Sequence, residues 1–551
     1  MYKLHLILKY LRRRRIAWVS LIAVMLCTAM VLVVISVMGG WLRMFRASFQ
    51  GLSGDVVVRA ESRAGFPYYE QMIAEMQKRP EIVAAVPLIE TWGLINIDNQ
   101  IRQAVRVVGL PLGDIGSVNG FWDSLYLKNP NTSSEELLAD LRHQYEGFRD
   151  EYEAALREEV ATGRVDEVFL REQLEEFDAR TAELMAPAEA WAAQRVEGQT
   201  PTFDLPWDAE VYRQKLARPD RPEEAGDPAT YPGMIIGVGV AAIERDEEGE
   251  MDRWIGLSPQ NPRPVKFMTL AITDDFATID LTTAKRERAF WVVDNSRTGV
   301  FQTDEQSVYV DFSLLQGDLG LDEQPIPGID PETFEPTGEI VGFEPARTGE
   351  VHVKLADGVP LEEGVRIVRE IVDRVLAEHE VVTLRPSVET WEARYRTFLE
   401  AVEREKALVT TLFAFISVVA IFLIFCIFYM IVAEKIKDIG IIKSVGATAG
   451  GIAAIFLGYG AAIGVVGAGL GVLVGWLIVR YINEIHHAMG QLLGIQIWSA
   501  QTYMFDRIPS SMNPNEVMVI VAVAIASSVL GAVVPALRAA RLKPVEALRF
   551  E

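Results

Sequence analysis

The sequence predicts a membrane α-helical protein of four transmembrane helices. A large α+β extracytoplasmic domain, containing an inserted helical hairpin, is predicted between helices 1 and 2. Three observations lead to this class. Four long apolar runs occur in a chain of 551 residues that is 50% hydrophobic. Each run is long enough to cross a bilayer, which takes about 20 residues. A long polar region with mixed strand and helix periodicity separates the first run from the other three, and one acidic stretch within it has heptad spacing.

Composition and charge exclude several kinds of protein. The formal net charge of −23 arises mainly from the region between the first two apolar runs, and an acidic surface disfavours nucleic acid as a partner. Both cysteines, Cys27 and Cys426, fall in predicted membrane helices, so disulfides do not hold the polar region together. The chain has no Gly-Lys pair and hence no P-loop for ATP. We therefore expect no cofactor on this chain, and if the protein uses ATP, a partner binds it.

The first span is predicted at residues 16–40. Residues 1–15 contain Lys3, Lys9 and four consecutive arginines, which predicts a cytoplasmic N-terminus. The apolar run is longer than the core of a signal peptide, and no cleavage site follows it. We therefore expect a helix that is retained in the membrane.

Residues 41–406 form the predicted extracytoplasmic domain. Period-two alternation and helical spacing give elements at both of its ends and in between. Strands are expected at 55–60, 82–95, 103–108, 234–243, 265–272, 290–293, 307–310, 351–355 and 381–384, helices at 68–77 and 361–377, and a proline-rich loop at 325–345. The domain should therefore be α+β.

The stretch from 121 to 230 differs from the rest of this domain. Apolar residues recur in steps of three and four over 133–188, with a break at 161–163, which predicts an antiparallel helical hairpin. The stretch holds 26 acidic and 12 basic residues. Such an excess is typical of solvated outer helix faces, and binding of a basic partner is the alternative.

The remaining chain alternates between membrane and water. Spans are predicted at 407–433, 452–479 and 517–536, joined by a cytoplasmic loop at 434–451 and an extracytoplasmic loop at 480–516, with a cytoplasmic C-terminus at 537–551. The polar, helix-favouring segment 397–406 runs directly into the second span. We expect the two to form one rod.

The loop 434–451 is a candidate for coupling to another protein. Its apolar residues recur at helical spacing among charged ones, which predicts a short amphipathic helix. An ordinary positive-inside loop is the alternative. The residues expected to couple this chain to a partner are Glu434, Lys435, Asp438, Ile439, Lys443, Gly446 and Ala447.

The third span is rich in glycine. Gly460 and Gly464, and then Gly467, Gly471 and Gly475, follow a four-residue spacing that allows helices to approach closely in lipid. Packing within one bundle and a seam between two protomers both fit this pattern. Elsewhere, the adjacent His486 and His487 have no neighbouring ligands, so no metal site is expected. No nucleophile–base arrangement stands out, and we expect that the chain is not an enzyme.

Two motifs resemble those of a known family. The segment Glu434-Lys-x-x-Asp-Ile-Gly-Ile-Ile-Lys-Ser-Val-Gly-Ala447 resembles the coupling segment of the FtsX/MacB/LolC class of ABC-transporter permeases, the mechanotransmission type. Pro535-Ala-x-Arg-Ala-Ala-Arg-Leu-x-Pro-Val-Glu-Ala-Leu-Arg549 is similar to its C-terminal signature. Within the class, Ser36-Val-Met-Gly-Gly-Trp41 and Gly54-Asp55 are closer to the lipoprotein-releasing LolC/LolE branch.

The resemblance fails over residues 114–230, where the acidic hairpin has no counterpart in that branch. The sequence also does not locate the loop by which the branch's C-type subunit hooks its periplasmic carrier. Whether this chain is C-like, E-like or forms a homodimer stays open, as do the cargo and the role of the hairpin.

The resemblance implies a function. A cytoplasmic ABC ATPase would dock on the coupling loop, a second permease protomer would complete the complex, and acylated lipoproteins would be extracted from the inner membrane of a bacterium toward an extracytoplasmic carrier. Both termini would be cytoplasmic. The groove for acyl chains would involve Val37, Trp41, Phe45, Leu399, Val402 and Leu408. Two alternatives keep the fold: an FtsX-like relay that controls a cell-wall hydrolase, and MacB-like efflux.

Overall fold

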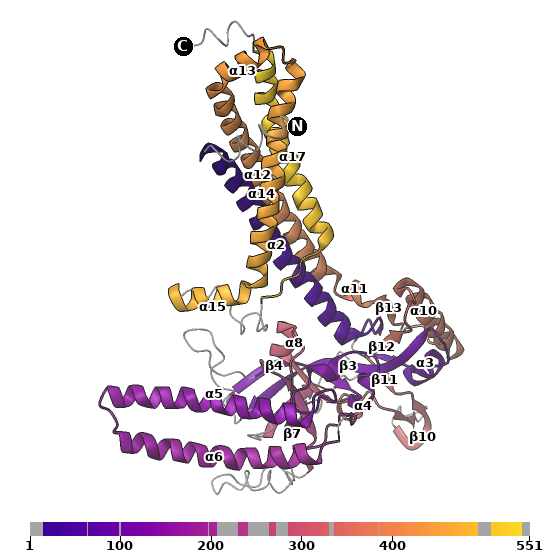
Figure 1. Ribbon diagram of the computed structural model, residues 1–551. Helices are drawn as coiled ribbons and strands as arrows, with labels where there is room; N and C mark the ends of the chain where they lie inside the picture. Colours follow the sequence, from indigo (N-terminus) through magenta and orange to yellow (C-terminus); the bar gives the residue numbers. More distant parts are fainter. Residues whose placement is uncertain are drawn as a thin grey trace. The chain divides into compact units, whose positions relative to one another are not determined.

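The structure is a computed structural model that describes residues 15–62, 64–97, 101–196, 198–205, 230–240, 264–270, 285–329, 336–383, 385–493 and 508–542. The chain divides into two compact units (Figure 1). One, the helical unit, comprises residues 1–46, 396–500 and 505–551. The other, the sheet unit, comprises residues 47–395 and 501–504. The basic segment 1–14 and the tail from 543 lie outside the described residues.

Four long helices are the main elements of the helical unit. They are α2 (Arg15–Ser53), whose last turns belong to the sheet unit, α12 (Arg396–Glu434), α14 (Ala449–Arg480) and α17 (Pro514–Arg541). Each contains an apolar stretch long enough to cross a membrane, and each of the four predicted spans lies within one of them. The α12 helix is unbroken, so the polar segment 397–406 and the second span do form one rod.

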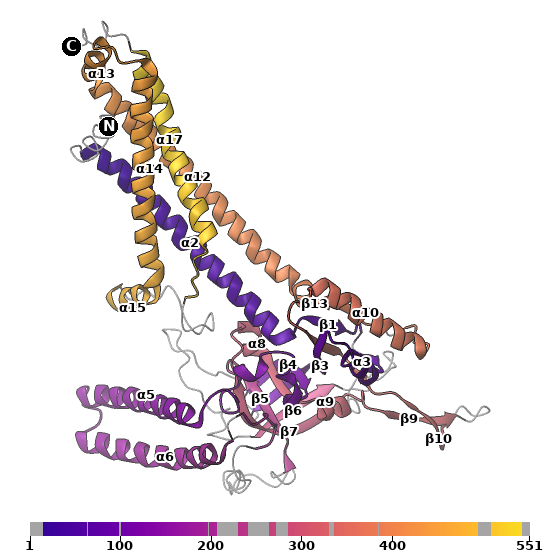
Figure 2. The same cartoon turned by 45° about the vertical axis from the view of Figure 1, so that its right-hand side comes forward.

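Two short helices join the long ones. The predicted amphipathic helix of the coupling loop is α13 (Ile436–Ser444), between α12 and α14. Helix α15 (Ile482–Leu493) follows α14 and turns away from its axis in both views (Figures 1 and 2). The most extensive helix contacts are those of α17, which packs against both α14 and α12.

A nine-stranded sheet forms the centre of the sheet unit. Its order is β13-β1-β12-β3-β4-β8-β5-β7-β6, and only the β4–β8 and β5–β7 pairs in it are parallel. The strands are β1 (Val56–Arg59), β3 (Ile82–Ile97), β4 (Ile101–Leu110), β5 (Gly233–Gly237), β6 (Pro264–Leu270), β7 (Lys285–Ser296), β8 (Ser307–Asp311), β12 (Glu350–Leu355) and β13 (Ser387–Thr390).

Part of this sheet closes on itself. Strand β6 pairs with β7 and also with residues 93–96 of β3, so six strands from β3 to β6 form a ring. At the closing contact Gly93 faces the ring of Phe267, where an added Cβ would collide with the aromatic carbons. A glycine is needed there because only a bare backbone allows β3 and β6 to approach.

Apolar side chains cover both faces of the sheet. One cluster contains Ile95, Val107, Phe267, Phe290 and Val308, and it continues under α3 (Tyr69–Met76) and α10 (Leu361–Glu378). A second cluster on the opposite face packs around Trp291. Helix α10 buries a stripe at positions 364, 367, 368, 371, 372, 375 and 376, which is the spacing of an amphipathic helix.

Helices α5 (Ser134–Ala161) and α6 (Glu167–Gln194) occupy the acidic stretch and lie side by side (Figure 1). Ser133 and Asp166 cap their N-termini by accepting backbone N–H bonds. Tyr152 stacks on Phe177 between the helices, and the Arg149 guanidinium lies 2.8 Å from the Asp178 carboxylate. Leu137 and Leu141 join the second sheet cluster and fasten the base of the pair.

Two predictions within the sheet unit were wrong. The loop expected at 325–345 contains a two-stranded hairpin, β9 (Gln324–Ile329) and β10 (Pro336–Glu344). Proline is tolerated there because the outer edge of each strand needs no hydrogen-bond partner. The strand expected at 381–384 is absent from its described residues, and Val382 is 75% exposed. The edge strand is instead β13, which begins directly after Pro386 and pairs with β1.

Candidate functional site

The helix α13 packs one side against its own chain. Ile439 is 4% exposed and lies with Val432, Ile452 and Ala539 in one apolar cluster, with Ala447 packed against it. These residues come from α12, α14 and α17. The α13 helix is therefore fixed to three of the long helices.

Lys443 strengthens this attachment. Its ammonium group donates to the carbonyl oxygens of Ala540 and Leu542, each at 2.6 Å. These carbonyls lie at the C-terminal end of α17, where backbone acceptors lack intrahelical partners and the helix dipole favours a cation. Lys443 thus serves as a cap that joins α13 to α17.

The opposite side of α13 is open. Ile441 is 53% exposed and Val445 is 83% exposed, and Gly446, with φ of +104°, ends the helix in a conformation that suits glycine. Lys435 and Asp438 pair with each other within the segment. Of the residues predicted to couple to a partner, Ile439, Lys443 and Ala447 make contacts within the chain. The exposed apolar pair was missed, although Ile441 lies about 200° around the helix from Ile439 by spacing alone.

The predicted glycine positions separate into two groups. A Cβ on Gly460 would lie 2.7 Å from Cβ of Ala532 in α17, and Gly464 also faces α17. Gly467, Gly471 and Gly475 face α2 instead, and a Cβ on Gly471 would lie 2.6 Å from Cβ of Thr28. One helix thus contacts two neighbours of the same chain through successive glycines.

We predict that Gly471→Ala destabilises the helical unit while Gly469→Ala does not. The methyl at 471 would also lie 2.7 Å from the Met25 carbonyl oxygen, so α2 must move, whereas nothing lies within 4 Å of a Cβ at 469. Overpacking of this kind costs about 1–3 kcal/mol. Thermal unfolding in detergent measures both variants. Equal midpoints for the two would contradict the packing described.

The residues of the predicted lipid groove occupy two helices. Val37, Trp41 and Phe45 are half-buried on α2, and the Trp41 and Phe45 rings meet edge to face at 5.8 Å. On α12, Leu399 and Val402 are 7% and 9% exposed, whereas Leu408 is 61% exposed.

Polar contacts bridge the helices at this end of the bundle. Arg46 of α2 lies 2.7 Å from Glu403 of α12, and Lys406 lies 2.9 Å from Glu516 of α17. The segment before α17 crosses α2 closely, because Ser511 N–H donates to the Ser36 carbonyl oxygen at 3.0 Å. A Cβ on Gly40 would lie 2.6 Å from the Pro509 carbonyl oxygen.

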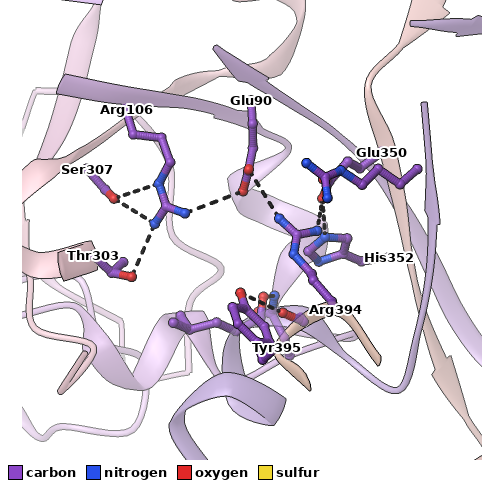
Figure 3. A network of polar contacts seen from close by, with 12 residues as sticks. Glu90, Arg106, Thr303, Ser307, Glu350, His352, Arg394 and Tyr395 are labelled. Atoms are coloured by element: carbon purple, nitrogen blue, oxygen red, sulfur yellow. Dashed lines mark hydrogen bonds and ion pairs between the residues drawn. The ribbon is translucent and has the colours of Figure 1, made fainter. Parts of the chain in front are cut away.

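A buried charge network lies in the sheet unit, and sequence reasoning missed it (Figure 3). Arg394 ends the short helix α11 (Trp391–Arg394), and its side chain is 8% exposed. Its guanidinium pairs with Glu350 of β12 and, at 3.2 Å, with Glu90 of β3. His352 contacts the same Glu350 carboxylate at 3.0 Å. We call Arg394, Glu90, Glu350 and their contacts the Arg394 network.

Electrostatics keeps the Glu350 carboxylate ionised. Burial has the largest single effect and by itself would raise the pKa of this carboxyl, but the Arg394 guanidinium and the His352 ring together outweigh it and hold the pKa well below its usual range. The sequence pattern concealed the site. Polar residues alternate with valines along β12, which is typical of a strand with one solvated face, yet Glu350 and His352 are covered in the tertiary structure.

We predict that Glu350→Gln destabilises the sheet unit in a pH-dependent way. At pH 7 the loss should be on the order of 3 kcal/mol, because Arg394 loses its closest counter-charge. The folded pKa of Glu350 lies below its ordinary value of 4.5, so the stabilisation is present above that pH and is lost as pH falls through the folded pKa. The stability difference between wild type and variant, measured by denaturant unfolding, should therefore shrink below pH 4.5.

The exposed Glu363, which pairs with Arg366 at 2.6 Å, supplies the control. Surface pairs contribute little, so Glu363→Gln should change stability by less than about 1 kcal/mol, with no comparable pH trend. A pH-independent effect of Glu350→Gln would contradict the assigned charge state.

Comparison with known proteins agrees with these features. Residues 410–544 match the family described as FtsX-like permease C-terminal, a segment that begins in α12 and contains α13, α14 and α17. This match and the relatives below support an ABC-transporter permease of the FtsX/LolC class, as the motifs predicted. The LolC relatives and the four apolar helices support an integral inner-membrane protein.

Individual relatives fit the same class. The chain is 32% identical over 164 residues to the lipoprotein-releasing system transmembrane protein LolC of Neisseria meningitidis serogroup B, which is 30% of this chain and 40% of that protein. It is 30% identical over 130 residues to LolE of Haemophilus influenzae, which is 24% of this chain and 31% of that protein. It is 32% identical over 126 residues to an uncharacterized ABC transporter permease of Methanocaldococcus jannaschii, which is 22% of this chain and 27% of that protein. The chain thus matches less than half the length of these relatives.

Proposed function

We propose that this permease transmits the ATP-driven movement of a separate cytoplasmic ATPase to an extracytoplasmic domain and so extracts lipoproteins from the inner membrane. The observation that carries the coupling role is α13, which is fixed to three membrane helices on one side and presents exposed apolar residues on the other. The lipoprotein cargo is proposed from the similarity to LolC and LolE, whose names state that activity.

The exposed face of α13 is the proposed docking site for the ATPase. Ile441 and Val445 are too exposed to contribute to the core, and apolar residues at the end of a membrane bundle favour a protein partner. ATP and Mg²⁺ would be bound by that partner. In this arrangement the α13 face is cytoplasmic, and the sheet unit is extracytoplasmic.

We predict that Ile441→Asp with Val445→Asp abolishes ATPase binding, because two carboxylates would be buried at the interface. Co-purification should fall by more than about tenfold, as expected for interface anchors. The pair Ile441→Leu with Val445→Ile preserves apolar contact and should retain the partner. Unfolding midpoints should be unchanged in both, since these side chains face outward. Undiminished co-purification of the aspartate variant would rule out this face as the docking site.

The β9–β10 hairpin is the proposed contact for an extracytoplasmic carrier. It projects from the sheet in both views (Figures 1 and 2). Its apolar side chains are exposed on both faces: Ile326 at 44%, Ile340 at 60%, Val341 at 68% and Phe343 at 60%. A hairpin with no core of its own gains little from such residues unless a partner covers them. A carrier of acylated polypeptides would supply a complementary apolar surface.

Native mass spectrometry of the complex extracted in mild detergent tests the proposed function. We expect an ATPase subunit and acylated polypeptides with the chain. An ATPase together with a cell-wall hydrolase, and no acylated cargo, would replace extraction with an FtsX-like relay. Recovery without any ATPase would refute the coupling role.

A further inference from the structure

The two chain segments that enter and leave the sheet unit are both held to it by specific contacts. At the end of α2, Asn119 donates to the Leu52 carbonyl oxygen and Gly120 N–H donates to the Gly51 carbonyl oxygen, each at 2.7 Å. Gly54, with φ of +70°, ends the helix. The last carbonyl groups of α2 are thus capped by a loop of the sheet unit.

The start of α12 is tied to the same place. Tyr395, the residue directly before α12, stacks on Phe49 of α2 with ring centroids 4.1 Å apart and planes inclined by 12°. Its hydroxyl is 3.3 Å from the Ser53 hydroxyl. The end of one long helix and the residue preceding the other are therefore in direct contact.

Arg394 extends this connection into the sheet. Only Tyr395 separates it from α12, so its position governs where α12 begins. Its guanidinium binds carboxylates on β12 and β3, two adjacent central strands. An arginine fits this role because its planar group can engage two acceptors in fixed directions, whereas a lysine ammonium cannot.

The charges continue across the sheet beyond these strands (Figure 3). Arg59 of β1 lies 3.4 Å from Glu350, and Arg106 of β4 lies 4.0 Å from Glu90. Arg106 in turn donates to Ser307 of β8 at 2.9 Å and to Thr303 of α8 (Phe301–Gln306) at 3.1 Å. The strands β1, β12, β3, β4 and β8 are consecutive in the sheet. Alternating charges, with the Ser307 hydroxyl at the end, thus connect Arg394, two residues before α12, to five neighbouring strands.

We infer that Arg394 is a positioning residue within the sheet unit. It fixes the last turn of α2 and the residue directly before α12 to the central strands, so that both chain connections leave the sheet from one defined place. This inference rests on the proposed function for its output, but not for its geometry. A buried ion pair contributes little net stability compared with apolar packing, so its charges are better explained by specifying one geometry.

A variant that removes the charges of Arg394, Glu90 and Glu350 together tests the positioning role of Arg394 separately from the stability of the sheet unit. Arg394→Met alone would leave the buried Glu350 and the half-buried Glu90 without the guanidinium that lies between them, which could unfold the unit. The triple variant Arg394→Met, Glu90→Gln, Glu350→Gln removes all three charges and should fold. Arg396→Met is the matched control, because Arg396 is exposed and only two residues away.

The first readout is hydrogen exchange of the full chain in nanodiscs. We expect amides at 47–53 and 400–406 to exchange about tenfold faster in the triple variant, since the helix ends lose their fixed attachment. Amides of β1 and β12 should remain protected, and the Arg396→Met control should match wild type. Unchanged exchange at both helix ends would overturn the inference, whatever the cargo proves to be.

The second readout is coupling in the reconstituted complex with its ATPase. Acylated polypeptide released per ATP hydrolysed should fall about fivefold or more in the triple variant, with ATP hydrolysis retained. Wild-type coupling in a variant with loosened helix ends would show that Arg394 is structural only. If the wild-type complex releases no acylated polypeptide, the proposed function fails. The hydrogen-exchange measurement then tests the positioning role of Arg394 by itself.

Discussion

The buried contact between one guanidinium and two carboxylates is the interaction on which the sheet unit's geometry depends. Arg394, Glu90 and Glu350 come from three separate parts of the sequence and meet on one face of the sheet. A charge left without its partner in such a place would cost several kcal/mol, so the three groups require one another. Because these contacts form in one arrangement only, they fix the position of Arg394 relative to β3 and β12.

The short helix α13 is likewise held in place by residues that are distant in the sequence. Its apolar residues do not form one stripe, because Ile439 faces the bundle while Ile441 and Val445 face outward. A helix end that exposes apolar residues to water favours a partner that covers them. One side is covered by the helices of the same chain, and Lys443 adds two hydrogen bonds to the end of α17. The other side is where a partner would be expected to bind.

The membrane helices are held by close approach rather than by hydrophobicity. Lipid is as apolar as the side chains, so helices gain little by burying leucine against leucine. The glycines of α14 let α17 and α2 approach until backbone and Cβ atoms touch, at Gly460 on one side and Gly471 on the other. The four-residue spacing that suggested either a bundle or a protomer seam is occupied, at these positions, by helices of the same chain.

Sequence alone determined the local features. Apolar run length gave the four spans, helical spacing gave α10 and α13, and motif similarity gave the permease class, because each depends on residues close together in the chain. Tertiary structure decided the rest. The alternation along β12 predicted a solvated face, but distant residues cover Glu350 and pair with it. The prolines near 325 predicted a loop, but two free edges allowed a hairpin. Which residues of α13 face outward was likewise set by α17, a helix about 100 residues away.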